Sequence, residues 1–258
     1  MIEPRRGPWK MKKMSDQNVN FEAAWALSQA PATGRRAQAH RLANAMRRVI
    51  DRLVQVAAPE EDLSAAADAL ERYARRLSKY PISRNYEGFA ESANAGDTHA
   101  FFDHSPLIGI ANPLAPPIRL AVLGNKVEGR ATFGLAYEGP PGHVHGGFLA
   151  AAFDEVLGMA QSLTGNPGMT GTLTIRYRRP TPLLTELTFE AYVDRVDGRK
   201  IFTHGMLSAN GTLTAEAEGL FIAVGQERFA AMAAMVTQRA TPPDEKTPPP
   251  GPRRRIKD

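Results

Sequence analysis

The chain has 258 residues, 43% hydrophobic and 23% charged, which is the composition of a globular protein with room for one sizeable core. It contains no cysteine, which excludes a disulfide scaffold, a Cys-ligated metal centre and a thiol nucleophile. The net charge is +5, and because much of the excess lies in the two tails we expect solvated tails and no nucleic-acid partner.

The N-terminal part begins with a basic segment, residues 1–32, that we expect to be largely disordered. Within residues 33–81 two amphipathic helices are predicted on either side of Pro59. In the second helix leucines repeat every seven residues from Leu63 to Leu77, and acidic residues in its first turn and basic residues in its last complement the helix dipole. We expect a helical hairpin that packs on the main domain or on a second subunit.

Short alternating strands follow, and they flank one apolar segment. The run FLAAAFDEVLGMAQSL (148–163) is apolar almost all round a helical wheel, which predicts a buried helix. Strands are expected before it at 118–126 and 127–137, and after it at 169–178, 183–196, 201–208 and 213–224. Asp-Gly and Asn-Gly turns and the lack of crossover helices predict that the last four strands form an antiparallel meander.

A helix that is apolar on nearly every side needs a curved sheet wrapped around it, which predicts an α+β fold. The last segment, residues 226–258, is expected to hold a short helix and a Pro-rich disordered tail. No apolar run approaches the roughly 18 residues that a membrane span needs, so no span is expected. Together with the absence of cysteine, this favours a cytoplasmic location.

The helix 148–163 contains an acidic residue where none is expected. A carboxylate such as Asp154 in an apolar helix costs several kcal/mol unless it is paired, protonated or facing a cavity. Just before the helix stands His145-Gly146-Gly147, where two glycines allow close backbone approach and the first-turn N–H groups are free to bind a ligand. This segment is the candidate functional site. His40, His99, His104 and His204 have no metal-ligand spacing, so no metal is expected.

Three ordered blocks carry a family resemblance: HGGFLAAAFDEVLG (145–158), MTGTLTIRYRRPTPL (169–183) and RVDGRKIF (195–202). Over residues 118–224 the chain resembles the hotdog-fold acyl-CoA thioesterases, especially the branch of phenylacetyl-CoA-type and long-chain fatty-acyl-CoA thioesterases. The resemblance implies a hotdog domain over residues 82–225, with a curved antiparallel sheet around one long central helix. It also implies an acyl-CoA substrate with no separate cofactor, because coenzyme A is part of the substrate.

The resemblance also implies a role for each matching residue. Asp154 matches the catalytic carboxylate, Gly147 the backbone donor that polarises the thioester carbonyl, and His145 the residue just upstream of it. Thr170 matches a hydroxyl beside the carboxylate and the attacking water. The positions that hold coenzyme A are matched by four cationic residues: Arg176, Arg178, Arg199 and Lys200.

The spacing within the helix has a consequence for assembly. Asp154 lies seven residues beyond Gly147, which is about 10 Å along a helix. One thioester carbonyl cannot easily meet both groups of the same helix. We therefore expect a homodimer with antiparallel central helices and two equivalent sites at its interface, possibly assembled further as a dimer of dimers.

Two other functions stay open at this level. One is a ligand-binding regulator, in which the hotdog domain senses acyl-CoA and the basic N-terminal helices bind DNA. However, the connection before Pro59 lacks the glycine often found in helix-turn-helix turns, and a regulator has no need of Asp154. The other is a hydratase or dehydratase of acyl thioesters, which typically pairs a His with the acid; no His stands close to Asp154 in sequence.

Overall fold

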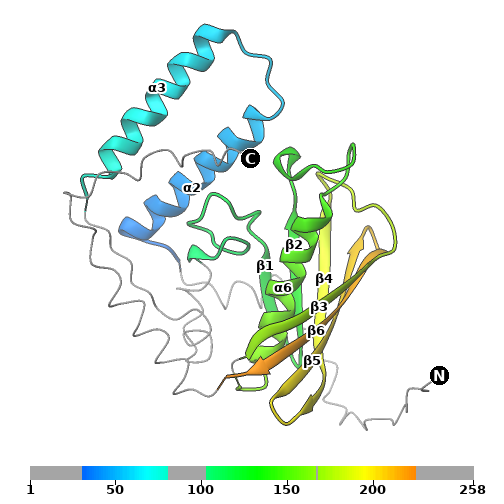
Figure 1. Cartoon of the computed structure of the whole chain (residues 1–258). Coiled ribbons are helices and arrows are strands. Elements are labelled where there is room, and N and C mark those ends of the chain that lie inside the picture. The colour runs from blue at the N-terminus through cyan, green and yellow to red at the C-terminus, as the bar shows by residue number, and fades with distance from the viewer. Residues whose placement is uncertain (1–30, 81–102, 167, 225–258) are drawn as a thin grey trace, which may run out of the picture.

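The computed structural model describes residues 31–80, 103–166 and 168–224. One antiparallel sheet of six strands, in the order β1-β2-β4-β5-β6-β3, curves around helix α6 (Figure 1). Its strands are β1 (Arg119–Leu123), β2 (Lys126–Thr132), β3 (Gly168–Tyr177), β4 (Glu186–Asp197), β5 (Lys200–Ala209) and β6 (Thr212–Ala223). This is the α+β hotdog architecture expected from the sequence.

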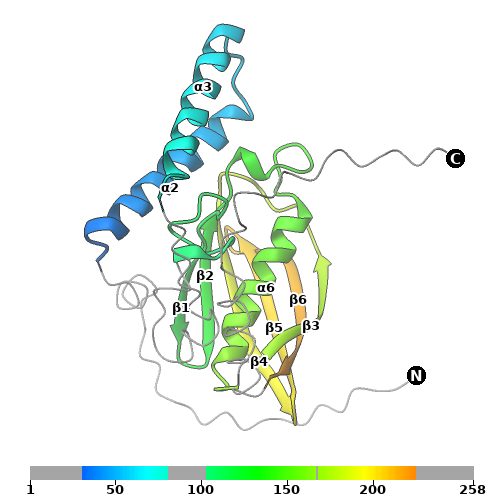
Figure 2. The same cartoon turned by 60° about the vertical axis from the view of Figure 1, so that its left-hand side comes forward.

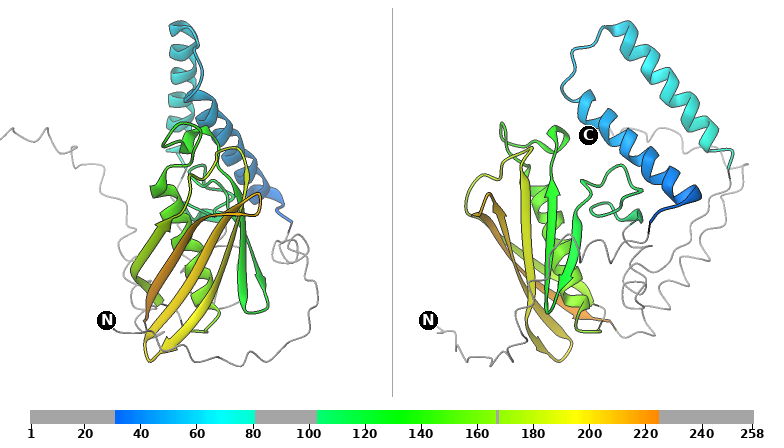
Figure 3. Two further views of the ribbon diagram at one scale, coloured as in Figure 1. Left: turned by 90° about the vertical axis from the view of Figure 1, so that its right-hand side faces the viewer. Right: turned by 180° about the vertical axis from the view of Figure 1, so that it is seen from behind.

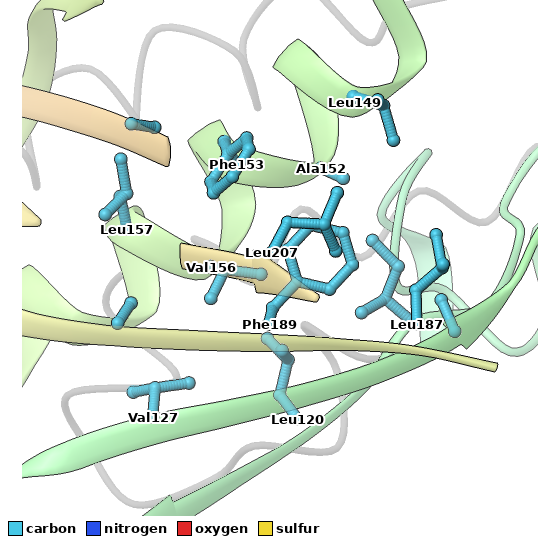
Figure 4. Close-up of a cluster of buried hydrophobic side chains, with 14 of the residues drawn as sticks. Leu120, Val127, Leu149, Ala152, Phe153, Val156, Leu157, Leu187, Phe189 and Leu207 are labelled. Atoms are coloured by element: carbon cyan, nitrogen blue, oxygen red, sulfur yellow. The ribbon is translucent and has the colours of Figure 1, made fainter. Parts of the chain in front are cut away.

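Helix α6 (Gly146–Ser162) supplies the centre of the core, as its apolar sequence predicts. Phe153, Val156 and Leu157 are at most 1% exposed and face the concave side of the sheet (Figure 4). Phe153 meets Phe189 of β4 edge to face, with ring centroids 5.5 Å apart. On β5, Gly205 keeps the sheet close to the helix, because a Cβ there would lie 3.1 Å from Leu157 Cδ2.

The predicted meander is correct for β4, β5 and β6 but wrong for β3. Strand β3 pairs with β6 and forms an edge of the sheet, while β1 forms the other edge (Figure 2). Strand β4 is already paired on both sides, with β2 and β5, so it offers no edge to β3. The eight-residue connection 178–185 contains Pro180 and Pro182, which prevent a tight hairpin and carry the chain from the edge to the middle of the sheet.

The hairpin turns occur where the sequence places them. The β5–β6 turn has positive φ at both Asn210 (49°) and Gly211 (74°), the combination that a type I′ turn requires. Gly198 in the β4–β5 turn has φ of 55°. The strand expected over 127–137 is shorter, because β2 ends at Thr132 and residues 135–137 form the short 3-10 helix η1 (Leu135–Tyr137).

Helix α2 (Gly34–Leu53) is fastened to the domain mainly by polar contacts. Arg47 donates hydrogen bonds of 2.7–2.9 Å to four backbone carbonyls, those of residues 109, 110, 112 and 115. Asp103 accepts hydrogen bonds from Arg36 Nε (2.5 Å) and pairs with His40 Nε2 (2.6 Å). At the far end of α2, Asp51 Oδ1 accepts the backbone N–H of Leu135 at 2.8 Å, so α2 holds the start of η1.

Helix α3 (Glu60–Leu77) is different, because none of its residues is buried. It stands outside α2 relative to the sheet (Figure 3, right). Both predicted helices are therefore present, but only α2 packs on the main domain. The expected disordered N-terminus and the expected short helix and tail of 226–258 lie outside the described residues. None of the helices in the described ranges combines the length and hydropathy of a membrane span.

Candidate active site

The carboxylate singled out in the sequence meets a hydroxyl from the edge of the sheet. Asp154 lies on α6 and is half-buried, and its Oδ1 accepts a hydrogen bond of 2.8 Å from Thr170 Oγ1 on β3. Sixteen residues separate the two in sequence. The acid therefore has a polar partner that orients it, and it is not enclosed by the apolar core.

The N-terminus of α6 forms the second part of the site. His145 is the N-cap residue, and its Nδ1 accepts the backbone N–H of Gly147 at 3.0 Å. Nδ1 must be unprotonated to accept this bond, so a neutral ring carries its proton on Nε2. The Gly147 N–H, which is expected to polarise the thioester carbonyl, is thus already bonded to the ring of His145. An incoming oxygen would have to share or replace that bond.

Tyr177 is a contributor that sequence reasoning missed. Its hydroxyl donates a hydrogen bond of 2.8 Å to the carbonyl oxygen of Gly146. A Cβ on Gly146 would lie 3.3 Å from the Tyr177 ring, so the glycine accommodates this close approach. Tyr177 ends β3 whereas Thr170 lies near its start. Strand β3 thus makes two contacts with α6. Its first residues meet Asp154, and its last residue meets the HGG turn.

The candidate acid and the candidate donor stay apart within one chain. Gly147 lies in the first turn of α6 and Asp154 lies seven residues further on, about 10 Å along the axis. Thr170 of β3 bonds Asp154, whereas Tyr177 of β3 bonds Gly146, the residue before Gly147. A single described chain therefore presents two separate half-sites along one helix.

The four cations expected to hold coenzyme A also fall into two groups. Arg176 pairs with Glu218 at 2.9 Å and Arg178 with Glu216 at 2.6 Å, both across to β6. The guanidinium of Arg178 lowers the pKa of the Glu216 carboxyl. At the opposite end of the sheet, Arg199 Nε donates to the carbonyl of Ala223 at 3.1 Å, and exposed Lys200 begins β5.

These two groups are not neighbours in one chain. Tyr177, next to Arg178, is paired with Ala215, whereas Lys200 is paired with Ile222 on the same strand β6. Seven residues of extended strand cover about 23 Å. One chain therefore does not bring the four cations around one ligand.

A second carboxylate lies beside Asp154 and faces another way. Glu155 accepts a hydrogen bond of 2.8 Å from Ser105 Oγ, which in turn accepts the backbone N–H groups of Leu107 and Ile108. Burial raises the pKa of the Glu155 carboxyl, and the charge of Asp154 adds to this shift, while the Ser105 hydrogen bond opposes it. No sequence signal predicts the Ser105–Glu155 contact, since the two residues are 50 positions apart. Among the described residues, no cluster of His, Asp and Glu side chains could hold a metal ion.

Solved structures share this fold. The crystal structure of the thioesterase superfamily protein RHA08564 aligns with a TM-score of 0.66 and 36% sequence identity, over 75% of this chain and 97% of that one. The chain belongs to the thioesterase superfamily. The family model of the Thioesterase superfamily matches residues 141–215, which include the HGG turn, helix α6 and strand β3.

Two acyl-coenzyme A thioesterases also match part of the chain. The acyl-coenzyme A thioesterase THEM4 of Mus musculus is 34% identical over 114 residues, covering 42% of this chain and 49% of the relative. The THEM4 of Bos taurus is 39% identical over 97 residues, covering 35% of this chain and 38% of the relative. The chain thus spans at most about half the length of these relatives.

Proposed function

We propose that the protein is an acyl-CoA thioesterase that hydrolyses acyl-CoA to a free carboxylic acid and coenzyme A. The observation that carries the proposal is the Thr170–Asp154 hydrogen bond at the open edge of the sheet, on a helix whose N-terminus offers backbone donors. A carboxylate and a preorganised N–H donor are the two groups that thioester hydrolysis requires. The names of the THEM4 relatives point to the same reaction.

In the proposed reaction the thioester oxygen accepts the N–H of Gly147, where the positive end of the α6 dipole stabilises the developing negative charge. By one route Asp154 takes a proton from water as the water oxygen attacks the carbonyl carbon. The tetrahedral intermediate then breaks its C–S bond, and the departing thiolate receives that proton. By the other route Asp154 attacks the carbon itself, expels the thiolate, and water hydrolyses the resulting anhydride. Thr170 orients the carboxylate in both.

We propose that the active unit is a homodimer formed through β3. This strand is a long sheet edge, and such edges readily pair with another strand. A two-fold axis near the middle of β3 would continue the sheet and bring Thr170 and Asp154 of one subunit to the Tyr177 and Gly147 end of the other. Each α6 would then supply the Gly147 N–H to one site and Asp154 to the other.

The same axis supports the proposed coenzyme A site. The Arg178 end of β3 would meet the partner strand's Gly168 end, where Gly168 is paired with Ala223 and Ala223 is bonded to Arg199. Arg176, Arg178, Arg199 and Lys200, separated within one chain, would then surround one ligand from two chains. Arginine pairs well with phosphate oxygens, which coenzyme A carries at its pyrophosphate and 3′-phosphate. We place this reaction, which needs no further cofactor, in the cytoplasm.

The proposal is tested with a panel of acyl-CoA substrates, from acetyl to palmitoyl and including aromatic acyl groups, by following the release of free thiol. We expect turnover of at least one class by a particle with the mass of a dimer or a multiple of it. Full activity of a monomer would contradict the shared site. If no thioester is hydrolysed but acyl-CoA binds, the protein is an acyl-CoA sensor. Hydration of an enoyl thioester without thiol release would indicate the hydratase reaction.

A further inference from the structure

Helix α3 carries a repeat that the hotdog domain does not use. Its apolar residues alternate at spacings of three and four, the a and d positions of a heptad, and we call this stripe the α3 seam. The α3 seam consists of Leu63, Ala66, Leu70, Tyr73 and Leu77. Such a stripe is typical of a helix that packs along another helix.

The α3 seam is uncovered in the single chain. Leu63 is 42% exposed, Leu70 51%, Tyr73 39% and Leu77 46%. An isolated helix of this length is marginal in water, and helices in proteins take most of their stability from packing an apolar face. The α3 seam therefore requires a covering surface that α3 does not obtain from the described part of its own chain.

Helix α2 does not supply that surface. Its own outward apolar residues are exposed as well, Met46 by 38%, Val49 by 47% and Leu53 by 59%. Two helices that covered one another would bury these side chains. The α2 face turned toward the domain is occupied by the polar contacts of Arg36, Arg47 and their partners. Helix α3, with its exposed stripe, thus stands away from the sheet (Figure 3, right).

The charges of α3 indicate what covers the seam. The first turn carries Glu60, Glu61 and Asp62, and the last turn carries Arg75 and Arg76. When two copies of α3 lie antiparallel, the acidic turn of each faces the basic turn of the other. A parallel pair would set like charges together. Alanines 67, 69 and 74 flank the middle of the seam, so two backbones can approach closely there.

A lipid surface fits less well. Helix α3 has more acidic than basic residues, and an interfacial helix on anionic lipid carries the opposite balance. We propose that the α3 seam pairs antiparallel with the α3 seam of a second copy of this chain. Since α3 lies apart from the β3 edge, this contact joins one β3-linked dimer to another (Figures 1 and 2). The contact does not depend on the proposed enzymatic activity.

The first test is the mass of the full-length protein in solution, measured by sedimentation or light scattering. Leu70→Glu places a charge at the centre of the α3 seam and should halve the mass of the particle. Leu70 is already exposed, so its replacement should not unfold the domain. Ala65→Glu, one turn earlier on the other side of the helix, is the matched control and should keep the wild-type mass. An unchanged mass for Leu70→Glu overturns the proposal and assigns the seam to another occupant.

The second test asks whether the contact runs between two copies and antiparallel. One variant reverses the acidic turn (Glu60→Lys, Glu61→Lys and Asp62→Lys), and a second reverses the basic turn (Arg75→Glu and Arg76→Glu). Each alone should have half the wild-type mass, because like charges then face one another. An equimolar mixture of the two should return to the wild-type mass. Failure of either variant to dissociate, or failure of the mixture to reassociate, overturns the antiparallel pairing.

Cross-linking gives an independent readout, because the natural chain has no cysteine. Ala69→Cys flanks the middle of the α3 seam and should form a disulfide-linked pair under mild oxidation, since the antiparallel arrangement brings residue 69 of the two copies together. Ala65→Cys is the control and should remain unlinked. Equal disulfide formation by the two variants would contradict pairing through the α3 seam. Thiol release from acyl-CoA, measured per chain, should be the same for Leu70→Glu and wild type, so loss of the seam and loss of the enzymatic function are distinguished.

Discussion

Thr170 Oγ1 donates a hydrogen bond of 2.8 Å to Asp154 Oδ1, and this bond joins the edge strand β3 to the central helix α6. It fixes the direction in which the carboxylate points. In the proposed reaction Asp154 is the acting group and Thr170 holds it in place. The two residues should therefore respond differently to substitution.

Removing the charge of Asp154 should abolish most of the activity. Asp154→Asn keeps the shape and the hydrogen bond from Thr170 but removes the base or nucleophile, so kcat should fall by about a hundredfold to ten-thousandfold. Glu155→Gln is the matched control, since it neutralises the adjacent carboxylate and still accepts the Ser105 hydroxyl. Both are measured by thiol release. Unchanged turnover in Asp154→Asn would exclude this residue from the reaction.

Loss of the Thr170 hydroxyl should weaken catalysis without ending it. A hydrogen bond to a charged group contributes about 1.5–3 kcal/mol, so kcat for Thr170→Ala should drop by about tenfold to a hundredfold with little change in KM. Thr170→Ser should restore much of the rate, because it returns the hydroxyl. Thr172→Ala, two residues along the same strand, lines the outer face of the sheet and should behave as wild type. A Thr172 effect as large as that of Thr170 would point to a general weakening of β3.

The cations at the β4–β5 turn should affect substrate binding more than chemistry. Replacing Arg199 and Lys200 together with Ala should raise KM for acyl-CoA roughly tenfold while kcat changes little, because the lost contacts are to phosphate and not to the reacting carbon. Arg195→Ala removes a nearby arginine that already pairs with Asp194 at 2.6 Å and serves as control. A fall in kcat at constant KM would argue against contact with coenzyme A.

Glu155 should make the stability of the protein depend on pH. Burial raises the pKa of its carboxyl in the folded state, so over a range above the ordinary glutamate value of about 4.3 the folded chain holds a proton that the unfolded chain has lost. Stability from this group therefore falls as pH rises through that range. Relative to Glu155→Gln, the Tm of wild type should decline as the pH rises above about 4.3. If the Tm of wild type instead rose relative to that of Glu155→Gln as the pH increased, folding would favour the charged carboxylate.

The docking of α2 should depend on one arginine. Arg47→Ala leaves four carbonyl oxygens without their guanidinium donor and should lower the free energy of unfolding by about 1–3 kcal/mol. Arg48→Ala, on the adjacent exposed position, should change it by less than about 0.5 kcal/mol. Chemical denaturation of the two variants measures the difference. Equal stability of both would show that α2 docks through other contacts.

Local features of this chain could be predicted from its sequence. The run around Asp154 has the period and polarity of a buried helix, and α6 forms there. Asn210-Gly211 predicts a hairpin because few residue pairs accept positive φ at two successive positions, and that turn is present. Each of these signals is local, because the residues that carry it lie close together in the sequence. Backbone sterics and side-chain periodicity then decide the local structure.

Only the tertiary structure decided which segments meet. Nothing in the pattern of β3 distinguishes β4 from β6 as its neighbour, and β3 became an edge strand because β4 was already paired on both sides. That position brought Thr170 to Asp154 and Tyr177 to Gly146. The sequence by itself determined the helix, the acid and the glycine turn. Long-range strand pairing decided their partners, because it depends on which edges remain free once the whole sheet is assembled.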